Sequence, residues 1–354
     1  MRPDGFIAWF EQIGLGDRAQ VGGKGGSLGE LTRAGIAVPP GFVIRTNAFE
    51  EFIESLERVA PLRARVDALA AGDLHSIRAC ADELRARVIC GELPGALVDE
   101  LAQAHRMLCG RSGGTHVAVR SSATTEDASD ASFAGLQDTY LWVGDVHHML
   151  ERVRACWASL YSVESISYRR DRGIAERDVA MGVVVQAMVD SRAAGVMFTR
   201  SPISGDRSVI TIEGAWGLGS AVVGGEVTPD RWVMGKITGE ISVREISDKH
   251  IEHRRAAAGG VDAVAVPDAR RRAPCLGDAE LEQLRQVARR VEKHYGCAQD
   301  IEWAIDPQGA ILLLQSRPET VWAEKDAAAA PMATPAARPF DHVFNILGGK
   351  KQGA

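Results

Sequence analysis

The sequence lacks several patterns that mark common classes of protein. Its 354 residues include six cysteines, but none of them forms a C-x-x-C pair or a zinc-type spacing. The first residues contain no apolar stretch typical of a secretory signal peptide, and no apolar run is long enough to span a bilayer. We therefore expect a cytoplasmic protein with reduced cysteines and no membrane partner.

An excess of positive charge is also absent. The chain has 41 Lys and Arg against 47 Asp and Glu, a formal net charge of −6, which argues against a nucleic-acid partner but allows a local basic pocket. Hydrophobic residues make up 45% and charged residues 25%, as in ordinary globular proteins. A chain of this length can form two or three packed lobes.

Familiar nucleotide-binding and nucleophile motifs are missing too. The segment Gly22–Gly26 is not a P-loop, because Gly25 follows Lys24 where Ser or Thr is required and Arg18 replaces the first glycine. Gly217-Leu218-Gly219 lacks the third glycine of a dinucleotide fingerprint. None of the nine histidines lies in a glycine-rich, threonine-containing loop that would present a reactive imidazole. These absences exclude the P-loop and Rossmann interpretations and favour structural or solvated roles for the nine histidines.

A hairpin near the end of the chain carries the most informative pattern. Gln299–Ile305 and Ala310–Pro318 both have the composition of strands, and Asp306-Pro307-Gln308-Gly309 has the preferences of a type I turn. Because side chains alternate along a strand, Asp300 and Glu302 share one face. Two acids on one face suit a hard divalent cation bridging a polyphosphate, and the alternative is a solvated face with an ion pair.

The register of the hairpin decides whether further polar groups join these acids. A turn that pairs Asp306 with Gly309 predicts that Asp300 lies opposite Gln315 and Glu302 opposite Leu313. Gln315 and Arg317 then share the face of the two carboxylates. A one-residue slip would move them to the opposite face, so the prediction depends on the register.

Two other segments suit phosphate. Four glycines around Lys24 predict a flexible backbone whose N–H groups approach anions beside a mobile cation, and the alternative is a plain connecting loop. Arg120 ends the apolar strand Val117–Arg120, where its guanidinium can fork onto phosphate oxygens. The alternative for Arg120 is an ion pair with Glu126 or Asp127.

Weaker patterns indicate a place for a purine and a further acid. Gln186 and Met188 lie on the strand Val183–Val189, where the glutamine and an exposed backbone edge could hydrogen-bond a base while the methionine packs on its face. A single polar residue on a half-buried strand is the common alternative. Glu213 could reach a metal ion or a ribose, or could be an ordinary loop acid.

The order of elements suggests three regions. We expect an N-terminal lobe over residues 1–190, a C-terminal lobe over 191–322, and a linker with an apolar tail over 323–354 that a partner could cover. Residues 62–108 are predicted to be largely helical, with a break near Gly91 and Pro94. Residues 252–275, rich in Ala, Arg and Gly, are predicted to form a surface excursion.

Several ordered motifs together resemble one known family. They are Val21–Leu31, Pro39–Phe42, Val119–Ala123, Phe133–Tyr140, Gly195–Thr199, Gly217–Gly219 and Gln315–Pro318. The set is similar to the nucleotide-binding part of phosphoenolpyruvate synthases and pyruvate phosphate dikinases, which rifampicin phosphotransferase shares. The resemblance runs from about Gly14 to Trp322 and is specific because many motifs occur in order.

The resemblance implies an α+β ATP-grasp fold in which two lobes close over ATP and Mg²⁺. The residues that it assigns to the nucleotide and metal site are Lys24, Arg120, Gly135, Thr139, Gln186, Asp300, Glu302, Gln315 and Arg317. The local patterns above add Met188 and Glu213 as candidate nucleotide contacts. Among the assigned residues, Lys24, Arg120 and Arg317 would be catalytic, acting on the phosphates. Glu302, Gln315 and Asp300 would hold the metal.

The resemblance also implies a reaction. In that family ATP gives its β,γ-diphosphate to a histidine and AMP is released, and the histidine lies on a separate swivelling domain that carries phosphate to a distant acceptor. Because the sequence stops soon after Trp322, we expect a histidine-bearing partner subunit in trans and a small-molecule acceptor. The alternatives are a self-sufficient small-molecule kinase and a non-catalytic ATP-sensing module.

Overall fold

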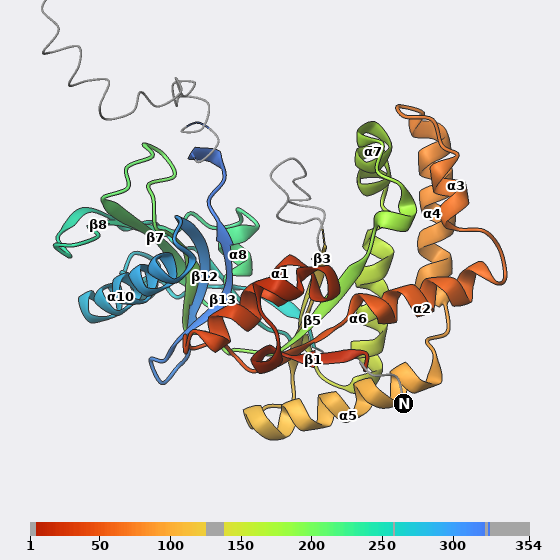
Figure 1. Cartoon of the computed structure of the whole chain (residues 1–354). Helices are drawn as coiled ribbons and strands as arrows, with labels where there is room; N and C mark the ends of the chain where they lie inside the picture. The colour runs from red at the N-terminus through yellow and green to blue at the C-terminus, as the bar shows by residue number, and fades with distance from the viewer. Residues whose placement is uncertain (1–4, 125–137, 258, 323–324, 326–354) are drawn as a thin grey trace, which may run out of the picture. The chain divides into compact units, whose positions relative to one another are not determined.

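The computed structural model describes residues 5–124, 138–257, 259–322 and 325 (Figure 1). The chain divides into two compact units, Met1–Pro318 and Glu319–Ala354. In the second unit the Lys325 ammonium lies 4.1 Å from the centroid of the Trp322 ring. Apart from Lys325, the region for which we expect a linker and tail lies outside the described residues.

The first unit contains a five-stranded antiparallel sheet in the order β1-β2-β5-β3-β4. Its strands are β1 (Ile7–Trp9), β2 (Gly41–Ile44), β3 (Val117–Ala123), β4 (Thr139–Val143) and β5 (Met181–Ala187). Every residue of β3 and β5 is buried, so both faces of these two strands are covered. Runs of Val and Ala without polar alternation favour this kind of strand.

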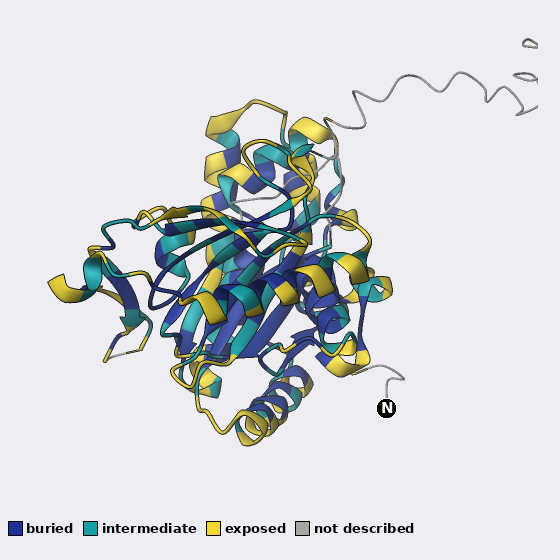
Figure 2. Ribbon diagram, turned by 90° about the vertical axis from the view of Figure 1, so that its left-hand side faces the viewer, coloured by how far each residue is buried: buried dark blue, intermediate teal, exposed yellow. Residues whose placement is uncertain are grey.

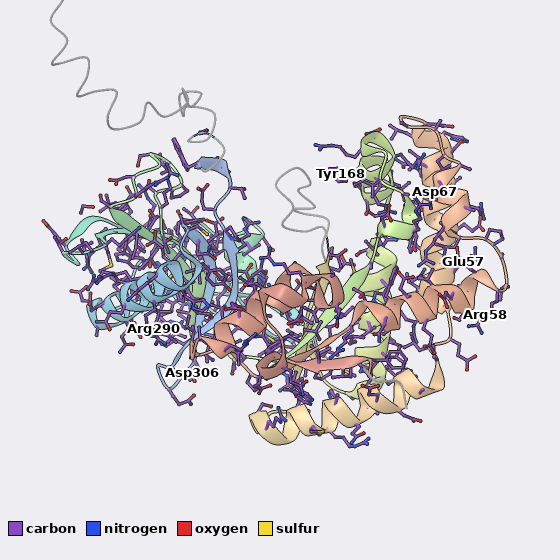
Figure 3. All side chains as sticks on the ribbon, in the orientation of Figure 1. Glu57, Arg58, Asp67, Tyr168, Arg290 and Asp306 are labelled. Atoms are coloured by element: carbon purple, nitrogen blue, oxygen red, sulfur yellow. The ribbon has the colours of Figure 1, made fainter. Side chains whose placement is uncertain are left out.

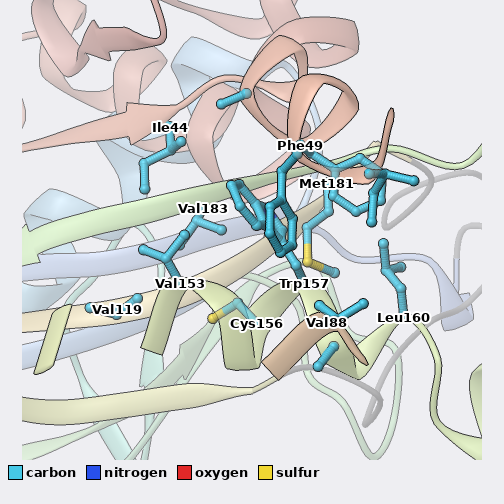
Figure 4. Packing of buried hydrophobic residues seen from close by; sticks show 14 of the residues in the cluster. Ile44, Phe49, Val88, Val119, Val153, Cys156, Trp157, Leu160, Met181 and Val183 are labelled. Carbon is cyan, nitrogen blue, oxygen red and sulfur yellow. The ribbon is translucent and has the colours of Figure 1, made fainter. Parts of the chain in front are cut away.

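Helices and short 3-10 turns surround this sheet. They are α2 (Thr46–Glu57), α3 (Arg63–Asp67), α4 (Leu74–Cys90), α5 (Gly95–Ser112), α6 (Val146–Ser159), α7 (Val163–Arg172), η1 (Phe10–Gln12), η2 (Leu15–Asp17) and η3 (Glu176–Asp178). The helical prediction for residues 62–108 and its break near Gly91 are confirmed. Trp157 stacks on Phe52 at a centroid distance of 5.1 Å and meets Phe49 edge-on, at the centre of the core in Figure 4.

A six-stranded antiparallel sheet follows in the order β13-β12-β6-β7-β8-β9. Its strands are β6 (Ala193–Phe198), β7 (Val209–Trp216), β8 (Asp230–Gly235), β9 (Ile241–Glu245), β12 (Gln299–Ile305) and β13 (Ile311–Pro318). One face packs on α10 (Asp278–Tyr295), whose Leu281, Leu284 and Val291 are fully buried. Figure 2 shows the buried strands in dark blue beneath helices with exposed outer faces. Whether the chain divides into lobes at residue 190 stays a prediction, because both sheets belong to one compact unit.

The region predicted to be a surface excursion is more ordered than expected. It contains a two-stranded ribbon, β10 (Ile251–Arg255) with β11 (Val261–Ala265), and the short helix α9 (Asp268–Arg271). A parallel bridge joins His253 of β10 to Gly217, just before α8 (Ser220–Val223). The ribbon is therefore tied to the segment that precedes α8.

Helix α1 (Arg18–Arg33) packs against elements of both sheets. Its Val21 and Leu28 pack with Val184 of β5, whereas Leu31 joins the core beneath the six-stranded sheet. The Ser27 hydroxyl also donates a hydrogen bond of 2.5 Å to the Ser316 carbonyl of β13. Among the described residues, no helix is both long enough and apolar enough to cross a membrane.

Candidate nucleotide and metal site

Arg120 of β3 connects the five-stranded sheet to the hairpin of β12 and β13. Its side chain, 9% exposed, donates from Nη1 to the Leu314 carbonyl at 2.8 Å. From Nη2 it donates to Glu302 Oε2 at 2.9 Å and to Gln315 Oε1 at 2.7 Å. The alternative partners that we considered, Glu126 and Asp127, lie outside the described residues. The structure thus brings the arginine, an acid and the amide into direct contact.

The hairpin register differs from the one predicted. Glu302 pairs with Gln315 and Asp300 with Arg317, not Leu313 and Gln315 respectively. The difference has two parts, the first at the turn. The Asp306 N–H donates to the Ala310 carbonyl at 3.1 Å, so the turn is one residue longer than assumed. Figure 3 shows Asp306 at the outer end of this hairpin.

A β-bulge in β13 returns Gln315 to the face of Glu302, from which the longer turn alone would move it. The pairing shifts between Glu302 and Trp303, which leaves Leu314 as the extra residue. Without the bulge, Gln315 would face away from Glu302, because successive side chains in a strand point to opposite faces. The same bulge leaves the Leu314 carbonyl outside the regular ladder, where it accepts from Arg120. The predicted shared face is correct, but it arises by a different register.

The strand pairs place the acids on the face of the six-stranded sheet opposite to α10. Glu302 pairs with Val196, and Val196 with Glu213, so these three side chains share that face. The neighbouring residues Ile301 and Trp303 point into the core instead and are at most 1% exposed. Glu213 is half-buried, and this burial raises its carboxyl pKa above the ordinary value, an effect that nearby Arg231 partly offsets.

A cavity of about 410 Å³ begins at Arg120 and runs along the end of β5. We call it the Arg120 cavity. Of the predicted site residues it is lined by Arg120, Thr139, Gln186, Met188 and Glu302. Its other walls come from the segment around α8 and from β12, including Leu218, Gly219 and Ala304. A mainly apolar cavity with a few polar groups at one end is a common form of ligand site.

The end of β5 differs from the purine edge that we expected. Gln186 is buried and donates from its side chain to the Pro39 carbonyl at 3.2 Å. The N–H of Ala187 donates to Pro40 and the N–H of Met188 to His116, so neither donor is available as an exposed edge. β5 is an internal strand of its sheet, which explains why these donors are already used. Met188 is half-buried and still lines the cavity.

The glycine-rich segment forms a helix, not the flexible loop that we expected. Residues 23–26 lie inside α1, and only Gly22 departs from helical geometry, with φ of 73°. A side chain at Gly22 is impossible without rearrangement, because a Cβ there would lie 2.0 Å from the Ser122 carbonyl oxygen. The Ser122 hydroxyl accepts from the Gly25 N–H at 3.0 Å and donates to the Val21 carbonyl at 2.8 Å. Lys24 is therefore held on a fixed, buried turn of helix.

The remaining predicted residues are not gathered in the cavity. Lys24, Glu213, Asp300, Gln315 and Arg317 are absent from its lining, although Gln315 contacts Arg120 directly. Arg317 lies 3.4 Å from Asp300 as an ion pair on the open face of the hairpin. Gly135 lies outside the described residues.

Sequence reasoning missed two residues that shape the site. Ser122 clamps the start of the helical turn that carries Lys24, and the Leu314 carbonyl binds Arg120. The polar run after Arg120 was a usable indication for Ser122. Nothing in the apolar run of β13 distinguishes Leu314 from its neighbours.

The donor set fits a magnesium ion and a polyphosphate in part. Glu302 and Gln315 present carboxylate and amide oxygens to one point, the ligands that a hard cation prefers. The described residues contain no cluster of three or more His, Cys, Asp or Glu side chains that could hold a metal alone. The protein would thus supply only part of a coordination shell, as is usual where phosphate oxygens and water complete it. Arg120 Nε is buried without a hydrogen-bond partner among the described residues.

Comparison with known proteins identifies the family. The family described as pyruvate phosphate dikinase, AMP/ATP-binding domain, matches residues 18–337. The chain belongs to this family. The α+β class is confirmed by the two sheets and their helices, and membership of the family supports the ATP-grasp assignment and ATP as the nucleotide.

The family's relatives are longer proteins. The probable phosphoenolpyruvate synthase of Methanothermobacter thermautotrophicus is 39% identical over 321 residues, which cover 90% of this chain and 46% of the relative. The phosphoenolpyruvate synthase of Pyrococcus furiosus is 36% identical over 364 residues, covering 91% of this chain and 45% of the relative. The chain therefore spans somewhat less than half the length of these relatives.

Solved structures resemble this chain only weakly. D-alanyl-alanine synthetase A from Vibrio cholerae matches with 12% identity and a TM-score of 0.23, covering 70% of this chain and 58% of that protein. A TM-score this low carries no argument about fold or function.

Proposed function

We propose that this chain binds ATP with Mg²⁺ and transfers the β,γ-diphosphate to a histidine on a partner subunit, releasing AMP. The observation that carries the proposal is the contact of Arg120 with Glu302 and Gln315 at one end of the Arg120 cavity. It joins a phosphate-binding cation to two oxygen ligands suited to magnesium. Family membership supports the nucleotide.

The proposed site residues would have two roles, stabilising phosphate charge and holding the magnesium ion. Arg120, Lys24 and Arg317 would stabilise negative charge on the phosphates as it redistributes. Glu302 and Gln315 would hold the magnesium ion, with Asp300 beside them. When bound, that ion would supply positive charge that neutralises the phosphates.

The base would lie at the other end of the cavity. Met188 and Leu218 offer apolar contact there, while Gln186 is held in place by its bond to Pro39. Thr139 lines the side between base and phosphates, and Gly135 and Glu213 remain proposed contacts of the phosphates and the ribose. This division follows the usual build of nucleotide pockets, apolar around the ring and charged around the phosphates.

The histidine would come from elsewhere. Among the described residues that line the Arg120 cavity there is no histidine. We propose that a histidine-bearing subunit in trans supplies it, with residues 323–354 as the docking segment. The acceptor would be phenol if the pair resembles phenylphosphate synthase, of which this chain would be the ATP-binding subunit, and pyruvate if it resembles phosphoenolpyruvate synthase.

Transfer of label tests the proposal. The purified chain is mixed with ATP labelled in the β-phosphate and with the histidine-bearing domain of a phosphoenolpyruvate synthase. AMP should form, and acid-labile label should appear on the partner. Arg120→Gln and Glu302→Gln should each lower AMP formation by about 10²-fold or more, because the first removes a cation that stabilises phosphate charge and the second removes a charged magnesium ligand. Arg58→Gln, at an exposed arginine labelled in Figure 3, is the matched control and should have no effect.

The alternatives give different outcomes in the same assay. A self-sufficient kinase would phosphorylate a small acceptor without the partner, and a sensing module would bind ATP but form no AMP with it. Undiminished AMP formation by the Arg120 and Glu302 variants would contradict the proposed site. Melting temperatures of the variants, measured alongside, separate loss of function from loss of fold.

A further inference from the structure

A second and larger cavity lies beside the Arg120 cavity. Its volume is about 900 Å³, and it is lined by β4, the start of α6, the region of α8, and the β10–β11 ribbon. We call it the Trp142 cavity. Thr139, Leu141 and Ser220 line both cavities, but among the predicted site residues only Thr139 reaches this one. Its other polar side chains have no part in the proposed transfer.

The acids of the Trp142 cavity are each paired with a histidine. Asp145 caps α6 by accepting from the His148 N–H at 2.9 Å, and its other oxygen lies 2.8 Å from His148 Nδ1. Glu226 lies 3.3 Å from Nε2 of the buried His253, whose Nδ1 is 2.9 Å from the Ser220 hydroxyl. Both carboxylates are therefore already engaged.

The arginines of this cavity are not paired in that way. The Arg152 guanidinium lies 5.0 Å from the centroid of the Tyr140 ring, and the Arg255 guanidinium 5.5 Å from that of Trp142. Within the part of the chain that the structure describes, neither arginine has a hydrogen bond or an ion pair. An arginine held against an aromatic face keeps its N–H edge available for an anion.

Trp142 adds a strained and buried element. It is the only non-glycine residue with positive φ among the described residues, at 57°, in the irregular part of the β3–β4 pairing. Bulky residues rarely adopt this conformation, and such strain is concentrated at functional sites. The side chain is 7% exposed, and its Nε1–H has no hydrogen-bond partner within the described residues. His116 meets the ring edge-on at 5.5 Å.

We propose that the Trp142 cavity is a second ligand site, which binds a small molecule carrying a phosphate group. Arg152 and Arg255 bind the phosphate oxygens, since they are the cavity's two cations without an acidic partner among the described residues. The cavity is much larger than one phosphate, so the ligand has an organic body that occupies the rest. The proposal does not depend on the proposed ATP-dependent transfer.

Isothermal titration calorimetry of the whole chain tests this site. The probes are ribose 5-phosphate and inorganic phosphate, titrated in separate runs. We expect ribose 5-phosphate to bind wild type, and Arg255→Gln and Arg152→Gln each to weaken it at least tenfold. Arg58→Gln is the matched control for loss of an exposed arginine and should bind as wild type does. Arg255 is exposed and makes no hydrogen bond within the described residues, so its variant should fold normally.

Two variants distinguish the cavities. Arg120→Gln alters only the first cavity, so it should leave ribose 5-phosphate binding unchanged if the site is the second one. Binding that is lost in Arg120→Gln but kept in Arg255→Gln would overturn the proposal, as would failure of both probes to bind at millimolar concentration. If inorganic phosphate binds as tightly as the ester, the organic body contributes nothing and the proposal of a phosphorylated small molecule is overturned. Tighter binding of the ester identifies a phosphorylated small molecule.

Discussion

The central strands of the five-stranded sheet and strand β12 of the six-stranded sheet differ in how their side chains are buried. In the five-stranded sheet, β3 and β5 are buried along their whole length. In the six-stranded sheet, β12 alternates, with Trp303 in the core and Glu302 on the open face. Strands β3 and β5 therefore have little tolerance for polar groups, whereas β12 has a face on which they can gather.

This difference explains where the informative residues lie. Polar side chains on β3 and β5 occur only where a specific partner satisfies them. Arg120 bonds to the hairpin, Ser122 clamps α1, and Gln186 binds the Pro39 carbonyl. A polar residue in a strand that is buried on both faces thus indicates that a specific partner satisfies it.

The largest expected effect comes from adding a charge to the fully buried sheet. Val185→Asp places a carboxylate at a position with 0% exposure, and we expect it to cost more than about 4 kcal/mol or prevent folding. Val233→Asp, on the partly exposed face of β8, should cost about 1 kcal/mol. Urea unfolding measures both. Similar losses for the two variants would refute the contrast between the sheets.

A smaller effect is expected where α1 meets β3. Gly22→Ala combines a positive φ with a Cβ 2.0 Å from the Ser122 carbonyl oxygen, so we expect a loss of about 2–4 kcal/mol. Gly16→Ala, which has no atom within 4 Å of its Cβ position, is the control and should change stability by less than about 0.5 kcal/mol. If Gly22→Ala is as stable as wild type, the close approach of residue 22 to Ser122 does not require glycine.

Loss of the Ser122 clamp should cost less than a change at Gly22. Ser122→Ala removes the acceptor of the Gly25 N–H and the donor to the Val21 carbonyl, both buried. We expect a loss of about 1–3 kcal/mol in the free energy of unfolding. Ser208→Ala, at an exposed serine, is the matched control and should be near neutral. Equal unfolding midpoints for the two variants would show that the Ser122 hydrogen bonds to α1 do not stabilise the fold.

The smallest effect concerns the open face and depends on pH. Burial raises the pKa of Glu213 in the folded protein above the ordinary value of 4.5, so the native state loses stability from this group as pH rises through that folded pKa. Glu213→Gln removes this penalty. Its melting temperature should equal that of wild type near pH 4 and exceed it by about 1 °C at pH 7.5. A melting temperature below that of wild type at pH 7.5 would mean that the attraction between Glu213 and Arg231 outweighs the cost of burying the carboxylate.

Local patterns in the sequence predicted the hairpin and singled out Arg120 as a candidate site residue. The turn residues and the alternation in β12 are strong local indications, and an arginine at this place in an apolar strand is unusual enough to notice. The register was not predictable, because it depends on the bulge at Leu314, and the run of three leucines does not say which residue is extra. That choice is made by contacts with Arg120 on another sheet.

The glycine-rich segment was misjudged for a similar reason. Each glycine inside a helix costs about 1 kcal/mol relative to alanine, so propensity argues against a helix over residues 23–26. The structure shows what outweighs propensity. A Cβ at Gly29 would lie 2.6 Å from Ile13, and one at Gly25 would lie 3.0 Å from Val43. These close approaches require glycine, but they are set by parts of the chain distant in sequence.

The bonds of Arg120 have a thermodynamic consequence for any ligand that approaches. Its guanidinium is an internal counter-ion, holding the same carboxylate and amide oxygens that a divalent cation would use. A cation arriving alone must compete with a charge already in place, whereas a cation arriving with phosphate gives the displaced guanidinium a new anion. Charge balance alone therefore favours joint uptake of metal and nucleotide over uptake of the bare metal.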